Sequence, residues 1–152
     1  MPLALGDKAK VTEKAKQLGF KVFAEIGKKF IGLPGGPKTH MPPSDVIREM
    51  KDCLEAGAFK VIYEYTEVVS LVAEDGGLER FLEVVASVGA DNMMFEVPTN
   101  IAPTWRDLSR YAMLYIEHIG PNVNLGDVDP SHVLTLETMR LGLTSRSGGK
   151  GN

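Results

Sequence analysis

Three glutamates each end a short, β-rich run of this 152-residue chain. Glu25 ends the run 21–25, and Glu64 and Glu96 end two later runs of the same kind. If these runs are parallel strands, their carboxyl ends lie at one edge of a sheet and the three carboxylates face one crevice. Like charges gathered there repel unless a cation or a shared proton offsets them, which favours a hard divalent ion such as Mg²⁺. The alternative, that each glutamate begins a solvated loop, fits the same spacing.

Other polar residues near strand ends are further candidates. The tripeptide Gly27-Lys28-Lys29 follows Glu25 directly. Glycine permits close backbone approach, and a lysine ammonium is a compact donor for an oxyanion or a developing enolate. Asn122 and Asn124 alternate along the run 122–125 and therefore share one face of a strand. Their amides either orient a ligand or hydrogen-bond to neighbouring loops.

Helical patterns that end in glycine precede these runs. The pattern 9–18 leads to Gly19, the pattern 78–88 to Gly89, and a pattern from about 104 to 119 leads to Gly120. Another helix begins after Pro43, with Ser44 or Asp45 as its cap, and ends at Gly57; its apolar face is Val46, Ile47, Met50, Cys53 and Leu54. Helices between strands are crossover connections, so consecutive strands should be parallel.

The remaining segments complete the expected organisation. The run 59–64 is apolar enough to be buried on both faces. The run 133–136, which ends at Glu137, is interpreted as a fifth strand after the strand 122–125. Five such strands predict an open or partial α/β sheet over residues 1–144, with a flexible tail at 145–152. The long Gly- and Pro-rich segment 30–43 lies on the carboxyl-end face, where long loops are commonly functional.

Composition excludes several classes of function. The net charge of -3, with acidic and basic residues interleaved, leaves no basic stripe for nucleic acid. No apolar run approaches the ~20 residues of a membrane span, and the first residues do not resemble a signal peptide. The single cysteine, Cys53, fits a packed helix face and a reducing compartment. The three histidines lack metal-ligand spacing, and no Walker, GxGxxG or GxSxG motif is present. We therefore expect a cytoplasmic protein with no membrane or nucleic-acid partner.

The strand ends resemble those of the phosphosulfolactate synthase family. The matching segments follow one another in the family's order along nearly the whole chain: 24–29, 55–64, 95–98, 120–126 and 136–143. The most specific of them are Pro-Asn-Val-Asn-Leu-Gly at 121–126 and Leu-Glu-Thr-Met-Arg-Leu-Gly-Leu at 136–143. The family is a TIM barrel, and the segments match its fourth to eighth strands. The resemblance therefore implies a partial (β/α)8 barrel.

The resemblance also implies a reaction and the residues that perform it. The family's founding activity is Mg²⁺-dependent addition of sulfite to phosphoenolpyruvate, a carbon–sulfur lyase reaction of coenzyme M biosynthesis. By this resemblance Glu25, Glu64 and Glu96 hold Mg²⁺ and the carboxylate of phosphoenolpyruvate. Lys28 protonates the enolate carbon or clamps an anion. The remaining substrate contacts implied are Lys29, Glu67, Glu96, Asn122 and Asn124.

The sequence departs from the family pattern in ways that keep two alternatives open. Where the family has Glu-Gly-Arg-Glu-Ser, the segment 64–68 reads Glu-Tyr-Thr-Glu-Val. Thr66 thus stands in place of the family's arginine, a residue type that binds phosphate or sulfonate through two hydrogen bonds. One alternative is a related lyase that acts on another enol or anion. The other is a non-catalytic relative that acts through protein association, since plant relatives are associated with heat tolerance. Because the family's first three strands have no counterpart, we expect a homo-oligomer or a partner chain that completes the barrel.

Overall fold

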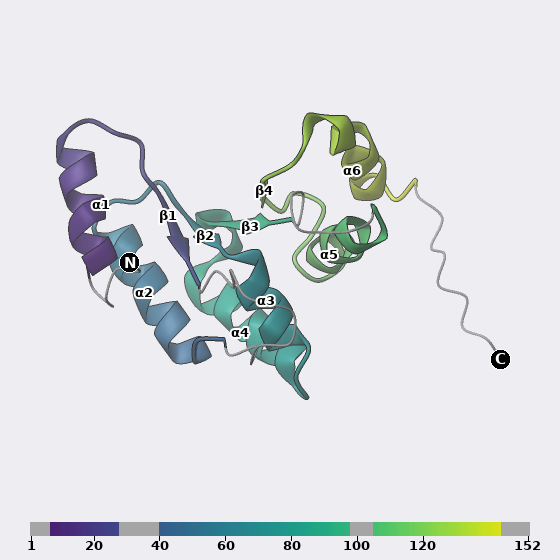
Figure 1. The fold of residues 1–152 in the computed structure, drawn as a ribbon, viewed down its shortest axis with the longest axis horizontal. Helices are drawn as coiled ribbons and strands as arrows, with labels where there is room; N and C mark the ends of the chain where they lie inside the picture. The colour runs from purple at the N-terminus through teal and green to yellow at the C-terminus, as the bar shows by residue number, and fades with distance from the viewer. Residues whose placement is uncertain (1–6, 28–39, 98–104, 144–152) are drawn as a thin grey trace, which may run out of the picture.

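The computed structural model describes residues 7–27, 40–97 and 105–143, and within them a single parallel sheet organises the chain (Figure 1). The predicted segments 28–29, most of 30–43, the start of the helix near 104 and the tail 145–152 lie outside the described residues. The sheet has the strand order β1-β2-β3-β4, and every pairing is parallel, as expected. The strands are β1 (Phe23–Ile26), β2 (Lys60–Tyr63), β3 (Met93–Glu96) and β4 (Leu125–Gly126).

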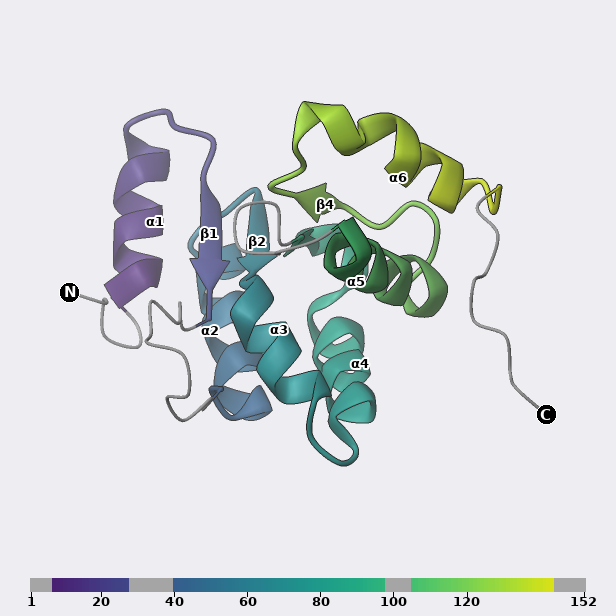
Figure 2. The same ribbon diagram turned by 45° about the vertical axis from the view of Figure 1, so that its right-hand side comes forward.

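Helices alternate with the strands along the chain. Those in the described residues are α1 (Asp7–Gln17), α2 (Pro43–Glu55), α3 (Tyr65–Val72), α4 (Gly77–Val88), α5 (Trp105–His118) and α6 (Val133–Arg140). Helix α2 contacts β1, β2, α1 and α4, and α6 packs against α5. Viewed from two directions, α1 lies at one end of the molecule and α6 at the other, with the sheet between them (Figures 1 and 2). This α/β arrangement fits the predicted partial (β/α)8 barrel.

One face of the sheet forms the hydrophobic core with the helices. Along each of the first three strands, alternate side chains are buried, and Tyr63 and Phe95 both pack against Phe81 of α4. The opposite face carries half-buried side chains, among them Ile62 and Met94. The expectation that 59–64 is buried on both faces is therefore wrong for β2, whose burial alternates. In a closed barrel the opposing strands fill that second face, and the described residues do not supply them.

The prediction of a fifth strand at residues 133–136 is wrong. Residues 133–136 begin helix α6 and form no strand. Asp129 precedes a 3-10 turn (Pro130–His132), and its carboxylate accepts hydrogen bonds from the Ser131 N–H at 2.8 Å and the Ser131 hydroxyl at 2.6 Å. These bonds start a helical turn that runs directly into α6. Leu136 and Met139 then point into the core at helical spacing.

Several element boundaries also differ from the sequence prediction. Strand β1 covers Phe23–Ile26 rather than 21–25, so Glu25 is its third residue and not its last. Strand β4 covers Leu125–Gly126 rather than 122–125, so both asparagines precede it. Helix α2 begins at Pro43 with Pro42 in the capping position, and neither Ser44 nor Asp45 caps it. Proline suits the first helical position because its φ is already helical and its missing N–H needs no partner.

Helix α3 is an element that the sequence patterns did not predict. It starts directly after β2, and Glu64 is its N-cap. Its partner is α4, which it approaches so closely at Gly77 that an added Cβ would lie 1.9 Å from the Leu71 carbonyl oxygen. No helix in the described parts of the chain is long and apolar enough to cross a membrane.

Candidate active site

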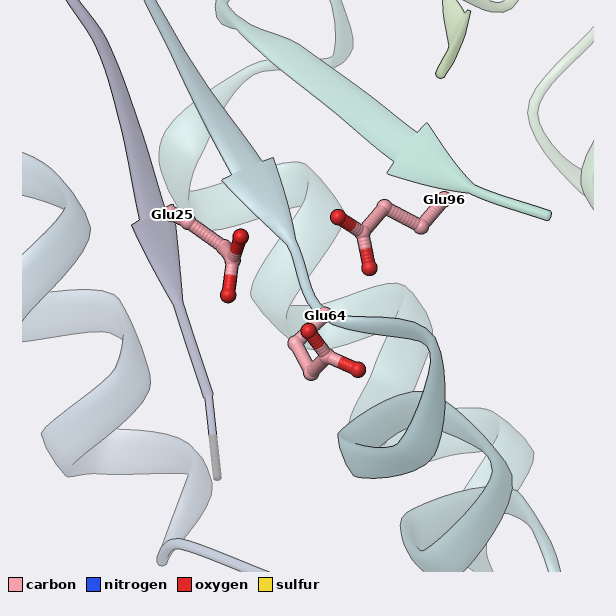
Figure 3. Close-up of side chains that lie close together, drawn as sticks. All are labelled: Glu25, Glu64 and Glu96. Carbon is pink, nitrogen blue, oxygen red and sulfur yellow. The ribbon is translucent and has the colours of Figure 1, made fainter. Parts of the chain in front are cut away.

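Three carboxylates converge at the carboxyl ends of β1, β2 and β3. Glu25 and Glu96 are half-buried, and Glu64 is 3% exposed. One carboxylate oxygen of each lies within 4.8 Å of those of the other two. Figure 3 shows the three side chains turned toward one another from neighbouring strands. The predicted gathering of Glu25, Glu64 and Glu96 at one edge of the sheet is therefore what the fold produces.

The start of helix α3 positions two of these carboxylates. Glu64 accepts hydrogen bonds from the Thr66 N–H at 3.4 Å and from the Thr66 hydroxyl at 3.2 Å. Glu96 accepts one from the Tyr65 N–H at 3.4 Å. The first N–H groups of a helix lack partners within the helix and carry partial positive charge, so they attract carboxylates. The helix thus holds two acids of different strands side by side.

The environment of the cluster disfavours the ionised form of Glu96. Burial, and then the neighbouring charge of Glu64, raise the pKa of Glu96 to about 7, with a smaller contribution from Glu25. The hydrogen bond from Tyr65 opposes this rise. Near neutral pH, Glu96 is therefore protonated in part of the molecules, which reduces its repulsion with Glu64. A bound divalent cation would offset the same repulsion. Three oxygen ligands from rigid strand ends suit Mg²⁺ or Ca²⁺ better than a softer metal.

Glu67 lies beside the cluster and is fully buried. Its carboxylate accepts a hydrogen bond from the backbone N–H of Met41, the residue that leads into α2. The pKa of Tyr63 is raised, mainly because the Tyr63 side chain is buried and to a smaller extent because the charge of Glu67 is close. In the structure, the Glu67 carboxylate therefore binds the backbone before α2. The substrate contact that the resemblance implies for Glu67 stays a prediction.

Gly27 explains how the chain leaves β1 so close to the acids. Its φ of +131° is disfavoured for other residues. A Cβ there would lie 2.6 Å from the Glu64 Cβ and 3.0 Å from the Glu67 Cβ. Glycine is thus required both by conformation and by space. Lys28 and Lys29, which follow it, lie outside the described residues, and their implied roles stay predictions.

The asparagines lie away from the glutamates. The Asn124 side chain donates a hydrogen bond to the Met93 carbonyl oxygen at 3.0 Å, and the backbone carbonyl oxygen of Asn124 accepts one from the Phe95 N–H at 2.9 Å. Met93 begins β3 and Glu96 ends it, so Asn124 sits toward the amino end. Asn122 lines a shallow hollow near Arg140. The structure does not bring the two amides into the carboxylate cluster, because they precede β4 rather than follow it.

Sequence reasoning missed the role of Arg140. Its guanidinium donates hydrogen bonds to the carbonyl oxygens of Pro121 and, at 2.9 Å, Val123. Its Nε lies 3.1 Å from the Glu137 carboxylate. Arg140 therefore joins the segment 136–143 to the segment 121–126, the two most specific parts of the resemblance. The sequence signal for this contact was that both segments match the same family.

Parallel strands with crossover helices and acids at their carboxyl ends define the class of the protein as a TIM-barrel type, of which the described residues form a part. A sequence model of the (2R)-phospho-3-sulfolactate synthase (ComA) family matches residues 1–146. The chain therefore belongs to the phosphosulfolactate synthase family.

Curated relatives named phosphosulfolactate synthase support this membership. The chain is 29% identical to that of Methanothermobacter thermautotrophicus over 153 residues, which cover 96% of this chain and 54% of the relative. It is 30% identical to that of Methanocaldococcus jannaschii over 153 residues, covering 97% and 56%. The Bacillus subtilis protein is 30% identical over 131 residues, covering 83% and 47%. The chain thus spans about half the length of the curated relatives it matches.

Proposed function

We propose that this chain contributes the metal and substrate site of a phosphosulfolactate synthase reaction, the Mg²⁺-dependent addition of sulfite to phosphoenolpyruvate. The observation that carries the proposal is the convergence of Glu25, Glu64 and Glu96 at the carboxyl edge of the sheet. Family membership supports the reaction type. A cytoplasmic location belongs to the same proposal.

The residues present fit a hard divalent cation. Glu25, Glu64 and Glu96 would hold it, because each offers a carboxylate oxygen from a fixed strand end. When bound, Mg²⁺ would supply the positive charge that offsets the charge developing on the substrate carboxyl oxygens. The raised pKa of Glu96 supports this assignment, since burial and then the neighbouring charge of Glu64 disfavour its ionised form, which a bound cation would stabilise.

The chemistry places specific demands on the chain. The sulfite sulfur forms a bond to C3 of phosphoenolpyruvate, the π electrons of the C2–C3 double bond move toward the carboxyl group, and C2 receives a proton. We assign that proton to Lys28, with Lys29 as an anion contact, because a lysine ammonium can serve either task. Glu67 keeps Met41 in place beside the cluster. Asn122 and Asn124 receive no role in this step.

A second candidate, a related lyase for another enol or anion, is favoured by Thr66. Its hydroxyl donates to Glu64, so this position provides a neutral group already engaged with the acid cluster. The family's arginine at the corresponding place would provide a bidentate cation for phosphate or sulfonate. A substrate with less negative charge would suit Thr66 better.

The test is product formation from phosphoenolpyruvate and sulfite with Mg²⁺, followed by phosphorus NMR. We expect phosphosulfolactate from the wild-type chain and at least about a hundred-fold slower turnover from Glu25→Gln, since a lost charge ligand removes transition-state stabilisation. Glu83→Gln, an exposed change on α4, is the control and should leave the rate unchanged. Mg²⁺ binding without turnover would favour the second candidate. Neither binding nor turnover by the folded chain would contradict the proposal and indicate a non-catalytic relative.

A further inference from the structure

The dipeptide His40-Met41, which leads into α2, is bound to both ends of helix α3. The Met41 N–H donates a hydrogen bond to Glu67 in the first turn of α3. The His40 imidazole reaches Glu74, just after the last residue of α3, with its Nε2 3.0 Å from a carboxylate oxygen. The two acids lie about two helical turns apart, roughly 10 Å along a helix axis. Attachment at both points therefore opposes sliding and rotation of α3.

The His40 ring makes two hydrogen bonds that both require it to donate. Its Nδ1 lies 2.6 Å from the Met41 carbonyl oxygen, and its Nε2 bonds to the Glu74 carboxylate. Carbonyl and carboxylate oxygens accept hydrogen bonds, so both ring nitrogens must carry a hydrogen for the two bonds to form together. This doubly protonated form is the imidazolium, which also forms an ion pair with Glu74. A neutral ring can donate only one of the two bonds.

The surroundings of His40 favour its charged form. Arg80 of α4, the helix beside α3, orients Glu74 by donating to its carboxylate at 2.8 Å (Figure 2). The hydrogen bond from His40 is the main cause that lowers the pKa of Glu74, and the charges of His40 and Arg80 lower it further. The charged side chains that the described residues join to the dipeptide, directly or through Glu74, are thus Glu67, Glu74 and Arg80. The ring therefore faces an ionised acid that is already held in place.

The position of α3 matters because its first turn holds two acids of the glutamate cluster. The Tyr65 N–H donates to Glu96, and the N–H and hydroxyl of Thr66 donate to Glu64. A shift or rotation of α3 would move these donors away from both carboxylates. Sites for cations depend on ligands that their surroundings keep oriented. The two attachments of the dipeptide are therefore part of what keeps the cluster assembled.

We propose that His40, as an imidazolium, is a positioning residue for the glutamate cluster. It fixes Met41 against Glu67 at one end of α3 and binds Glu74 at the other end. The first turn of α3 then keeps Glu64 and Glu96 in place. The effect on cation binding rests on the proposed function, whereas the effect on α3 does not.

The first test is amide hydrogen exchange, followed by NMR, on the metal-free chain at about pH 6. His40→Ala should lower the protection factors of the Met41 amide and of the α3 amides about ten-fold, because both attachments are lost. The α5 amides should keep their protection, which shows that the variant is folded. His40→Asn places an amide donor near the position of Nδ1 and should recover part of the protection of Met41. His118→Ala, which removes an exposed histidine at the end of α5, should change neither segment.

The same measurement over a pH series tests the charge of His40. Histidine ordinarily changes its charge between pH 5 and pH 8, so protection of the wild-type Met41 amide should fall over this range. His40→Asn does not titrate and should lack that fall. Glu96, with its pKa of about 7, titrates in the same range in both proteins. The difference between the two profiles therefore reports His40 alone.

Calorimetric titration with Mg²⁺ separates this inference from the proposed function. We expect His40→Ala to bind Mg²⁺ at least about three-fold more weakly than the wild-type chain, and His118→Ala to bind equally well. A wild-type chain that binds no Mg²⁺ would contradict the proposed function, and the exchange data would still decide the role of His40. Unchanged protection of Met41 and α3 in folded His40→Ala would overturn the inference. Equal pH profiles for the wild type and His40→Asn, or equal Mg²⁺ binding by the wild type and His40→Ala, would overturn it as well.

Discussion

The raised pKa of Glu96 is the clearest effect of the site on a single residue. Burial of its carboxylate, and then the neighbouring charge of Glu64, raise its pKa from 4.5 to about 7. The folded state therefore holds the proton of Glu96 more tightly than the unfolded state does. The stabilisation from this raised pKa is complete at pH below about 4.5 and is lost as the pH rises through 7.

A pH series of urea unfolding checks this at the residue scale. Without divalent cation, the contribution of Glu96 to the free energy of unfolding should fall between pH 5 and pH 7.5, because the ionised carboxylate is partly buried and repels Glu64. Glu96→Gln should remove that part of the pH dependence, and Glu83→Gln on α4 should retain it. Added Mg²⁺ should restore stability at pH 7.5. Identical profiles for wild type and Glu96→Gln would contradict the raised pKa.

Gly27 makes a second prediction at this scale. Gly27→Ala should lower the free energy of unfolding by about 2–4 kcal/mol, because it combines backbone strain with a contact against Glu64. Gly120→Ala is a matched control, since Gly120 has a similar φ of +129° with nothing within 4 Å of the added Cβ. It should cost only the backbone term, about 1–2 kcal/mol. Equal losses in urea unfolding would show that the close approach at Gly27 contributes nothing.

At the scale of elements, the sequence predicts the first three strands and the glycine-terminated helices, and it fails at α3 and α6. The runs at β1, β2 and β3 are short and largely apolar, and the glycine-terminated helices between them predict parallel crossover connections. Residues 133–136 misled the interpretation because a short apolar run fits a strand as well as a buried helix. The Asp129 side chain, which caps the turn before α6, decides between them.

Helix α3 escaped prediction for a related reason. Several of its residues are β-branched, among them Thr66, Val68 and Val69, and these have weak helix propensity. Packing against α4 and the N-cap at Glu64 outweigh that preference. The element matters because its first N–H groups hold Glu64 and Glu96. The gathering of the acids was therefore predictable from strand ends, and the means of holding them was not.

Arg140 joins two elements, because its side chain binds helix α6 to the segment before β4. Arg140→Met keeps the apolar stem and removes hydrogen bonds to Pro121 and Val123. We expect a loss of about 1–3 kcal/mol in the free energy of unfolding. Arg48→Met breaks only an exposed ion pair with Asp45 and should cost less than about 1 kcal/mol. If urea unfolding gives both variants the same stability, the clamp does not hold these elements.

At the scale of the whole molecule, the candidate site depends on segments far apart in the sequence. Glu25, Glu64 and Glu96 meet only when β1, β2 and β3 are paired in register. A cation bound there should stabilise the folded chain, since the unfolded chain presents no such cluster. The family's whole barrel cannot be read from these residues alone, because they match about half of each curated relative.

The most direct measurement is calorimetric titration of the metal-free chain with Mg²⁺ at pH 8, where Glu96 is ionised. We predict one cation per chain, and binding at least about ten-fold weaker for Glu64→Gln, because one of the three charged ligands is lost. Glu83→Gln should bind as the wild-type chain does. No binding by the folded wild-type chain, or equal binding by Glu64→Gln, would contradict a divalent-cation site at the three glutamates.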